Sequence, residues 1–589
     1  MASWFRCIAL ASAVLSLAAC DDTTVFPPPP ATYDFTPEIV EIGSLHGIAM
    51  VSADETWAVG DRGLILRHNG TLWSRSESGV TADLLAVWSP RAGEVFAAGR
   101  GGTLLQHVSG AWQRVDTGVG QDLNGVTGTS RLDVYLVGDA GRILRFDGVA
   151  VTPMTSHTVN DLRAVWAASG TDIFAVGDDG LALHFDGGEW KAQTTPTSQN
   201  LRAVTGLSPT DVYAVGNAGT ALYYNGVEWN EMSSGVARNL LGIWGVNDLY
   251  ACGEGGTVIH YDGLQWTPFT SSIFTAQNLE AIDGLPAADV VLVGTAGTVV
   301  RFDWTGFKKE MGDGGAVYRG VWGFPAGDVF AVGNFAQVFH RDANGWRIMA
   351  GGLPHQLNDV WGPTPDDVTA VGDAGLVLRY SSGGWTSSAG GTTEGLNGVW
   401  GFSTGDVYAV GNNGAMVHFD GLAWSELAPV TAKVLHAVWG PDASDVFAVG
   451  NDGVVLHFDG TAWSTMATLN TVALVGVWGS SGSNVLAVGT GAAGQPNAFR
   501  FDGTSWRPED IGTVAALESV FGTSAGDIFA VGFGGRNANR YRDAFFHFDG
   551  EDWTRADTGS FMSFTDVWAG GGSVFAVGTG TLTYRATPR

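Results

Sequence analysis

The sequence predicts an all-β fold made of one short unit repeated fourteen times. Three observations support this. The stretch 435–463, LHAVWGPDASDVFAVGNDGVVLHFDGTAW, contains short apolar runs separated by the turn residues Pro-Asp, Asn-Asp-Gly and Asp-Gly. Most of the chain repeats this pattern, mainly at intervals of 39 residues. No 3.6-residue apolar period indicates helices. The glycine that ends the second run marks the copies: Gly60, Gly99, Gly138, Gly177, Gly216, Gly253, Gly294, Gly333, Gly372, Gly411, Gly450, Gly489, Gly532 and Gly578.

Each repeat predicts four antiparallel strands. Runs rich in Val, Phe and Trp between turn residues are typical of strands. Asp459-Gly460 joins the third run to a fourth at Trp463, and such a dipeptide favours a tight hairpin. A four-stranded unit with a period near 39 residues fits a β-propeller blade of roughly 40–45 residues. Because one propeller has about four to eight blades, we expect tandem β-propellers, with two rings of seven blades.

The seventh repeat gives the expected boundary between the rings. It reads Asp303-Trp304-Thr305-Gly306 where other repeats have Asp-Gly-x-x-Trp. The position after the Val of VWG also changes from a mixture in the first half to almost only Trp in the second. We therefore expect one propeller in 38–303 and another in 304–589. The final repeat lacks a Trp-bearing fourth strand, so we expect ring closure by strand exchange, with 38–42 closing the first ring and 304–312 the second.

The N-terminal residues resemble the leader of bacterial lipoproteins. Residues 1–20 hold a charged start, a short apolar run and Leu17-Ala18-Ala19-Cys20. The resemblance implies cleavage before Cys20, acylation of Cys20 and a lipid anchor in the bacterial cell envelope. Residues 21–37 are polar and Pro-rich, and we expect an extended tether. Whether the anchor is in the inner membrane, the outer membrane or at the cell surface stays open.

The repeats also resemble known propeller repeats. The order LxAVWGPDxxDVFAVGxDGxVLHFDG is similar to WD40 and YVTN repeats and to the BNR-type repeats of the sortilin and photosystem-assembly-factor group. Two departures matter. The third strand ends in Phe-Asp or Tyr-Asp in place of Trp-Asp, and Asp459 and Gly460 are adjacent where the Asp box has a residue between them. The resemblance therefore implies the fold and no ligand residues.

Composition argues against several partners. The formal net charge is −29, whereas nucleic acids and anionic membranes require a basic surface. We expect no nucleic-acid binding, membrane contact only through the lipid, no cofactor, and a monomer. Three cysteines provide no disulfide framework, and Cys252 occupies a position that is Val in matching runs, which predicts a small buried side chain.

The third strand carries a repeated basic residue. We assign His107, His184, His260, His340, His418, His457 and His547 to this position, and Arg stands there in other repeats. Asp usually begins the second strand, so we predict structural Asp–His pairs such as Asp445 with His457. Ligand binding is the alternative. A metal site is not expected, because each His lies in a different blade.

No catalytic motif stands out. Two G-x-S-x-G matches, at 401–405 and 522–526, lie in turns between strands, whereas a nucleophile elbow leads into a helix. A propeller glycosidase or lyase would need paired carboxylates in one channel, and we expect no unrepeated acidic pair on the inner strands. The sequence therefore predicts a non-enzymatic binding or scaffolding module for a protein or glycan. An envelope assembly factor and a pilus-associated adhesin subunit are the alternatives.

The candidate binding loop lies in the thirteenth repeat. The interval from Gly532 to His547 is about twice the usual length and carries three arginines in an acidic chain. Such side chains suit carboxylate or phosphate groups. An ordinary tolerated insertion is the alternative. The candidate residues are Arg536, Asn537, Asn539, Arg540, Tyr541 and Arg542.

Overall fold

The computed structural model describes residues 33–39, 42–246, 248–269, 275–285, 289–302, 307–312, 317–381, 383–469, 471–491, 495–512, 516–537, 540–556, 558, 563–579 and 582–588. In these residues the fold is all-β, with four-stranded antiparallel sheets as in tandem propeller blades. The repeat at 435–463 is one such sheet, formed by β42 (Leu435–Asp442), β43 (Asp445–Gly450), β44 (Val454–Phe458) and β45 (Trp463–Thr468) in chain order. The meander expected from the sequence is therefore confirmed.

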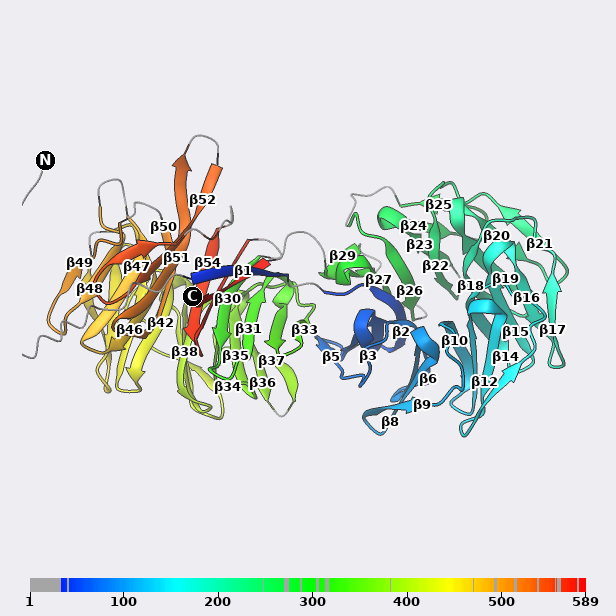
Figure 1. Ribbon diagram of the computed structural model, residues 1–589, viewed down its shortest axis with the longest axis horizontal. Coiled ribbons are helices and arrows are strands. Elements are labelled where there is room, and N and C mark those ends of the chain that lie inside the picture. Colours follow the sequence, from blue (N-terminus) through cyan, green and yellow to red (C-terminus); the bar gives the residue numbers. More distant parts are fainter. Residues whose placement is uncertain are drawn as a thin grey trace, which may run out of the picture.

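Two groups of sheets lie side by side (Figure 1). In the first group, neighbouring sheets contact each other through their first strands. The first strand of the last sheet also contacts the first strand of the first sheet, so the series closes. Its first strands are β2 (Leu45–Ser52), β6 (Leu84–Arg91), β10 (Leu123–Ser130), β14 (Leu162–Ser169), β18 (Leu201–Ser208), β22 (Leu240–Gly245) and β26 (Leu279–Gly284).

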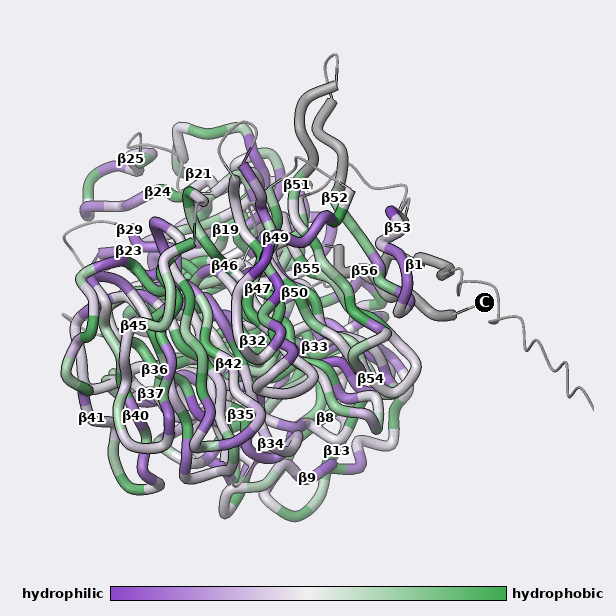
Figure 2. The backbone as a smooth tube through the Cα atoms, turned by 90° about the vertical axis from the view of Figure 1, so that its left-hand side faces the viewer, coloured by the Kyte–Doolittle hydropathy of each residue, from purple (hydrophilic) through white to green (hydrophobic). Residues whose placement is uncertain are grey.

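The second group closes in the same way, because the first strand of its last sheet contacts the first strand of its first sheet. Its first strands are β30 (Tyr318–Gly323), β34 (Leu357–Thr364), β38 (Leu396–Ser403), β42, β46 (Ala473–Ser481), β50 (Ala516–Ser524) and β54 (Phe564–Gly570). Apolar residues, green in Figure 2, are concentrated along the strands. The second strands, such as β43, are almost wholly buried between neighbouring sheets and form much of the core.

The turns between second and third strands explain the repeated Asp, Asn and Gly. Most contain a three-residue 3₁₀ turn, of which the first is η1 (Asp61–Gly63) and the last η10 (Asn412–Gly414). The central residue has positive φ, for example 58° at Asp179 and 54° at Asn413. Asn and Asp tolerate this left-handed conformation better than most residues, as the sequence predicts.

The closing strand of the second group comes from the N-terminus. β1 (Tyr33–Ile39) pairs along its whole length with β56 (Leu582–Pro588), the third strand of the last sheet. The expectation that 38–42 closes the first ring is therefore wrong, and β1 begins inside the predicted tether. The final repeat lacks a fourth strand of its own, so β56 would otherwise present a free edge.

The expectation for 304–312 is also wrong. β29 (Phe307–Met311) pairs with β28 (Val299–Phe302) and completes the seventh sheet of the first group. A hairpin over so few residues costs little loop-closure entropy, which favours this local pairing over exchange into a distant sheet.

The two groups share one sheet. β5 (Trp73–Arg75) of the first group pairs with β33 (Gly345–Gly351) of the second, which gives an eight-stranded sheet. Trp73 is fully buried there, and its indole Nε1 donates to Glu310 Oε2 at 2.8 Å. Glu310 Oε1 also accepts from Arg301 Nε at 2.5 Å. The backbone pairing of β5 with β33 and the packing of Trp73 in one apolar cluster with Ile348 therefore join the two groups, whereas the Glu310 contacts lie within the first group.

Candidate functional site

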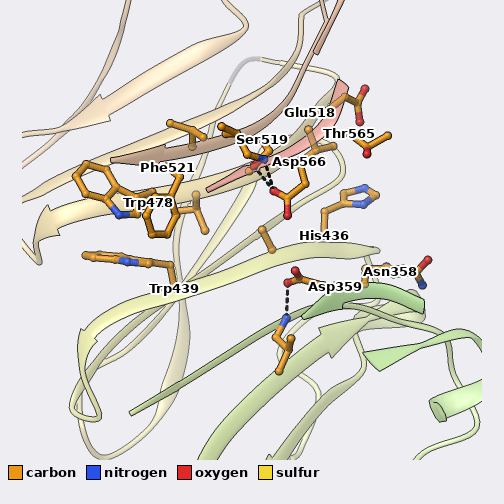
Figure 3. Close-up of a pocket in the computed structure, with 18 of the residues that line it drawn as sticks. Asn358, Asp359, His436, Trp439, Trp478, Glu518, Ser519, Phe521, Thr565 and Asp566 are labelled. Carbon is orange, nitrogen blue, oxygen red and sulfur yellow. Dashed lines mark hydrogen bonds between the residues drawn. The ribbon is translucent and has the colours of Figure 1, made fainter. Parts of the chain in front are cut away.

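A cavity of about 130 Å³ lies on the axis of the second group. All seven first strands of this group contribute to its lining. Figure 3 shows the aromatic side chains of Trp439, Trp478 and Phe521 on one side, and Glu518, Thr565 and Asn358 on the other. We call the aromatic end the floor and the polar end the mouth.

The floor consists of packed aromatic rings. Successive ring centroids are 6.2–6.4 Å apart from Trp322 through to Trp568. Five of the rings line the cavity: Trp322, Trp400, Trp439, Trp478 and Phe521. The Gly of the VWG motif permits this packing, since a Cβ at Gly401 would lie only 2.6 Å from the Trp361 ring.

The same packing occurs in the first group, where Trp alternates with smaller residues. A Cβ at Gly206 would lie 2.6 Å from the Trp166 ring, and one at Gly128 would lie 2.9 Å from the Trp88 ring. There Trp88 and Trp166 pack on the Gly of the next sheet, which carries a Thr in place of Trp, and Trp244 packs on Gly284, whose sheet carries Asp283. The second group instead carries an aromatic residue in every sheet, which produces the continuous floor.

Backbone N–H groups point into the cavity. Gly411 N, at the end of the second strand of its sheet, donates to Ala415 O on the side of the third strand. Along a strand, the backbone N–H and C=O groups of successive residues point to opposite sides. Those of Val410 therefore point toward β38, and those of Ala409 point away from it. Val399, opposite Ala409, therefore directs its N–H toward the axis. The repeat places seven valines in this way: Val321, Val360, Val399, Val438, Val477, Val520 and Val567.

Two half-buried aspartates accept from four of these N–H groups. Asp359 Oδ1 and Oδ2 each accept at 2.8 Å, from Val360 N and Val399 N. Asp566 Oδ2 accepts from Val321 N at 2.7 Å. Asp566 Oδ1 accepts from Val567 N at 2.9 Å and from Ser519 Oγ at 2.5 Å. Among the described residues, no side chain accepts from the N–H of the remaining three valines, which lie on β42, β46 and β50.

Burial raises the pKa of both carboxyl groups. The pKa of Asp566 is raised to about 6, although hydrogen bonds from Ser519 and Val321 oppose the effect. The pKa of Asp359 is raised well above its usual range, first by burial and then by the negative charge of Asp566. Because removal from water disfavours the charged form, these groups retain protons that exposed aspartates would release.

The expectation of no unrepeated acidic pair on the inner strands is therefore wrong. Asp359 and Asp566 stand where other repeats of the second group have Gly, Ala or Ser, in LNDVW and FTDVW. This substitution was visible in the sequence. What the repeat pattern did not reveal was that the two positions line one cavity.

The mouth is polar. It consists of Arg319, Asn358, Asn397, His436, Glu518 and Thr565, with Val475 as the one apolar residue at this position. Several of these residues bond to the turn after the second strand, including His436 Nε2 to Asn451 Oδ1 at 2.8 Å and Asn397 Nδ2 to Asn412 Oδ1 at 3.1 Å. Burial raises the pKa of Glu518, and the charge of Arg319 opposes this shift.

The predicted binding loop is mostly strand. β51 (Asp527–Asn537) and β52 (Arg540–Phe548) form a long hairpin, with Asn537 opposite Arg540 and Gly534 opposite Arg542. It extends beyond the neighbouring sheets (Figure 1). The hairpin continues a second–third strand connection, so it rises on the mouth side. Asn539 lies outside the described residues, and recognition by Arg536, Arg540, Tyr541 and Arg542 stays a prediction.

The Asp–His pairs lie away from the cavity. His457 Nε2 is 2.7 Å from Asp445 Oδ1, and the His457 ring packs on Phe447 with centroids 4.7 Å apart. Neither residue lines the cavity. The same pairing at 2.7 Å joins His340 to Asp328 and His418 to Asp406. His107 was assigned to this position incorrectly, because it lies opposite Val95, and Gln106 occupies the repeated place opposite Phe96.

The other candidates are placed as follows. Cys20 lies outside the described residues. Cys252 is fully buried, as expected, and burial raises the pKa of its thiol. In the described part of the chain, no group of three or more His, Cys, Asp or Glu side chains could hold a metal ion. No described helix is long and apolar enough to cross a membrane.

Closed series of four-stranded antiparallel blades define a β-propeller repeat protein. Among solved structures, this chain is similar to Ycf48 bound to a D1 peptide, at 14% identity and a TM-score of 0.39, over 47% of this chain and 99% of that one. It is similar to Ycf48 from Cyanidioschyzon merolae at 17% identity and a TM-score of 0.38, over 47% and 100% of the two chains. The extracellular domain of a hybrid two-component system from B. thetaiotaomicron aligns at 8% identity and a TM-score of 0.37, over 95% and 83%.

No protein-family model matches this chain. No curated protein matches its sequence.

Proposed function

We propose that this protein is a non-catalytic binding or scaffolding module built from two seven-bladed β-propellers. Each closed series of first strands corresponds to one propeller. The observation that carries the proposal is the polar-mouthed cavity on the axis of the second propeller, with the β51–β52 hairpin rising on the same side. A concave site with a few convergent polar groups is the usual form of a binding site, and propellers present broad loop faces to partners.

The partner is a protein or a glycan, and the site lies in the bacterial cell envelope with the chain anchored through lipid on Cys20. The connection between the two propellers supports a scaffolding role. The shared sheet, in which Trp73 pairs with Gly351, and the apolar cluster that contains both Trp73 and Ile348 connect the propellers. A partner bound at the second propeller would therefore be held in a defined orientation to the first. An envelope assembly factor and an adhesin subunit both fit this arrangement.

A glycosidase is the second candidate, and the pair Asp359 and Asp566 favours it. Glycoside hydrolysis uses two carboxyl groups, one of them with a raised pKa. However, every carboxyl oxygen of this pair already accepts a backbone N–H. Such bonds hold the strands in place, which favours a structural role. Hydrolysis of a panel of aryl glycosides, abolished in Asp359→Asn, would support the enzyme instead.

The binding proposal is tested by partner capture from envelope extracts. The bait is the full chain carrying Cys20→Ser, and the matched variant replaces 533–544 with the Asn-Asp-Gly turn of the repeat at 435–463. We expect both proteins to fold, as judged by circular dichroism, and only the bait with the hairpin to retain its specific partner. If both capture the same partners equally, the hairpin is not the binding surface. If neither captures a specific partner, the binding function is wrong.

A further inference from the structure

We propose that the axial cavity of the second propeller binds a small organic ammonium ion. This inference rests on the proposed binding function and specifies the ligand class of that site. Three features of the lining support it independently: its charge, its aromatic floor, and its remaining backbone donors. The size of the cavity then limits the ligand to a small ion.

The charge of the lining favours a cation. Asp359, Asp566 and Glu518 line the cavity, and Arg319 at the exposed mouth is the one Arg or Lys among the lining residues. Burial opposes ionisation of all three carboxyl groups. A positive ligand would offset this by pairing with the charged forms. The chain as a whole has a formal net charge of −29, which also attracts cations toward it.

The floor favours an organic cation. Five aromatic rings line the cavity, and the face of an aromatic ring attracts positive charge, most strongly for Trp. Methyl groups on an ammonium ion bury apolar surface against such rings, which a hydrated metal ion does not. In the described part of the chain no His, Cys, Asp and Glu side chains cluster closely enough to hold a metal. The lining therefore suits a cation recognised by ring faces and charge.

The cavity is small. Its volume of about 130 Å³ is comparable to that of cavities that bind a ligand the size of benzene. A tetramethylammonium or choline ion is of comparable size, whereas a folded segment of a partner is not.

The remaining N–H groups favour an acceptor on the ligand. Val438, Val477 and Val520 lie on the first strands of three consecutive sheets, β42, β46 and β50, and their N–H groups face the cavity on the arc that Asp359 and Asp566 do not cover. A buried N–H requires an acceptor from the ligand or from water. A hydroxyl or carboxylate attached to the ammonium group, as in choline or betaine, would provide one. We therefore expect choline to bind more tightly than tetramethylammonium.

The first propeller provides a matched control. Glu280 occupies the same repeat position as Glu518, and burial raises the pKa of both. The positions equivalent to the floor of the second propeller carry Ala49, Trp88, Thr127, Trp166, Thr205, Trp244 and Asp283 in the first. The first propeller therefore has the equivalent of Glu518 but no continuous aromatic floor.

The test is to titrate ligands into the full chain carrying Cys20→Ser and to measure binding by Trp fluorescence and by calorimetry. The ligands are choline, tetramethylammonium and the neutral isostere 3,3-dimethylbutan-1-ol. We expect both ammonium ions to bind at one site per chain, and the neutral isostere to bind at least about tenfold more weakly, because it loses the cation–π and charge interactions.

The variant Glu518→Gln should weaken choline binding several-fold, whereas Glu280→Gln should leave it unchanged. Phe521→Leu, which removes one ring of the floor, should weaken it as well. Thermal unfolding confirms that each variant is folded. Equal binding of choline and the neutral isostere, or no binding of either ammonium ion by the folded chain, overturns the inference. Partner capture by the same bait is measured separately, so loss of the cation site alone would leave the proposed function standing.

Discussion

Asp566 Oδ2 accepts a hydrogen bond from Val321 N at 2.7 Å and thereby joins the last sheet of the second group to its first. The first group has the same device, because Asp283 Oδ2 accepts from Met50 N at 2.7 Å. Both aspartates are half-buried, and each connects residues more than 200 positions apart in the chain. A half-buried carboxylate therefore accepts a backbone hydrogen bond across the seam where each series of sheets closes.

The first prediction concerns the pH dependence of Asp283→Asn. Burial raises the pKa of Asp283 to about 7, from an ordinary value of 3.8. The folded wild type then binds more protons than the unfolded chain between these values. The free energy of unfolding of the wild type should therefore fall, relative to the variant, as pH rises from about 4 to about 7, and stay low above that. The change is up to about 4 kcal/mol, at 1.36 kcal/mol per pKa unit.

Denaturant unfolding at several pH values measures this difference. Asn keeps an acceptor oxygen for Met50 N, so the variant should fold. The control is Asp552→Asn on the exposed surface, which should follow the wild type at every pH. A pH-independent difference between the wild type and Asp283→Asn would show that Asp283 does not titrate in this range.

The second prediction concerns β1. Deleting 33–39 removes the strand that pairs with β56, and the last sheet then ends in an unpaired edge. We expect faster hydrogen exchange in β56 and a loss of about 2–4 kcal/mol in the stability of the second propeller, from several backbone hydrogen bonds. Deleting 21–31 is the control and should change neither. Unchanged exchange in β56 after removal of 33–39 would contradict the pairing.

The third prediction concerns Trp73 at the shared sheet. Trp73→Ala removes a fully buried ring and its bond to Glu310, which should cost about 3–5 kcal/mol. Because this residue contributes to the connection between the propellers, we expect the two to unfold in separate steps. Differential scanning calorimetry would resolve them. Trp112→Ala, elsewhere in the first propeller, should destabilise the protein without separating the transitions.

The fourth prediction concerns the Asp–His pairs. A double-mutant cycle on Asp445 and His457 should give a coupling energy of about 0.5–1 kcal/mol. A cycle on Asp445 and His418, which lie in different sheets, should give a coupling near zero. If the first cycle also shows no coupling, the pair does not stabilise the sheet, and a ligand role for these histidines becomes the better explanation.

The fifth prediction concerns the N-terminus. We expect mass spectrometry of the mature protein to find acylated Cys20 as its first residue. Cys20→Ser should leave the propellers folded and release the protein from membranes. An unmodified Cys20 in the mature chain, or cleavage elsewhere, would contradict the lipid anchor.

Much of the fold followed from the sequence alone. A strand needs only a short apolar run, and a turn needs only one or two suitable residues. The local pattern of the repeat at 435–463 was therefore sufficient to predict the four-stranded sheet from β42 to β45. The Gly and Asp of its turns had to stand where positive φ is required. The pair Asp445 and His457 was also predictable, because a hairpin brings together residues at a known spacing. All of these are local relationships.

Tertiary structure decided what depends on distant segments. Nothing in the local pattern of 33–39 distinguishes pairing with β56 from pairing with a strand of the first group, because a free sheet edge accepts any strand that can reach it. Asp359 and Asp566 are separated by most of the second propeller in sequence, and only closure of the series brings them to one cavity. Burial in this cavity raises the pKa values of both carboxyl groups. Two positions that depart from the repeat pattern therefore belong to one candidate binding site.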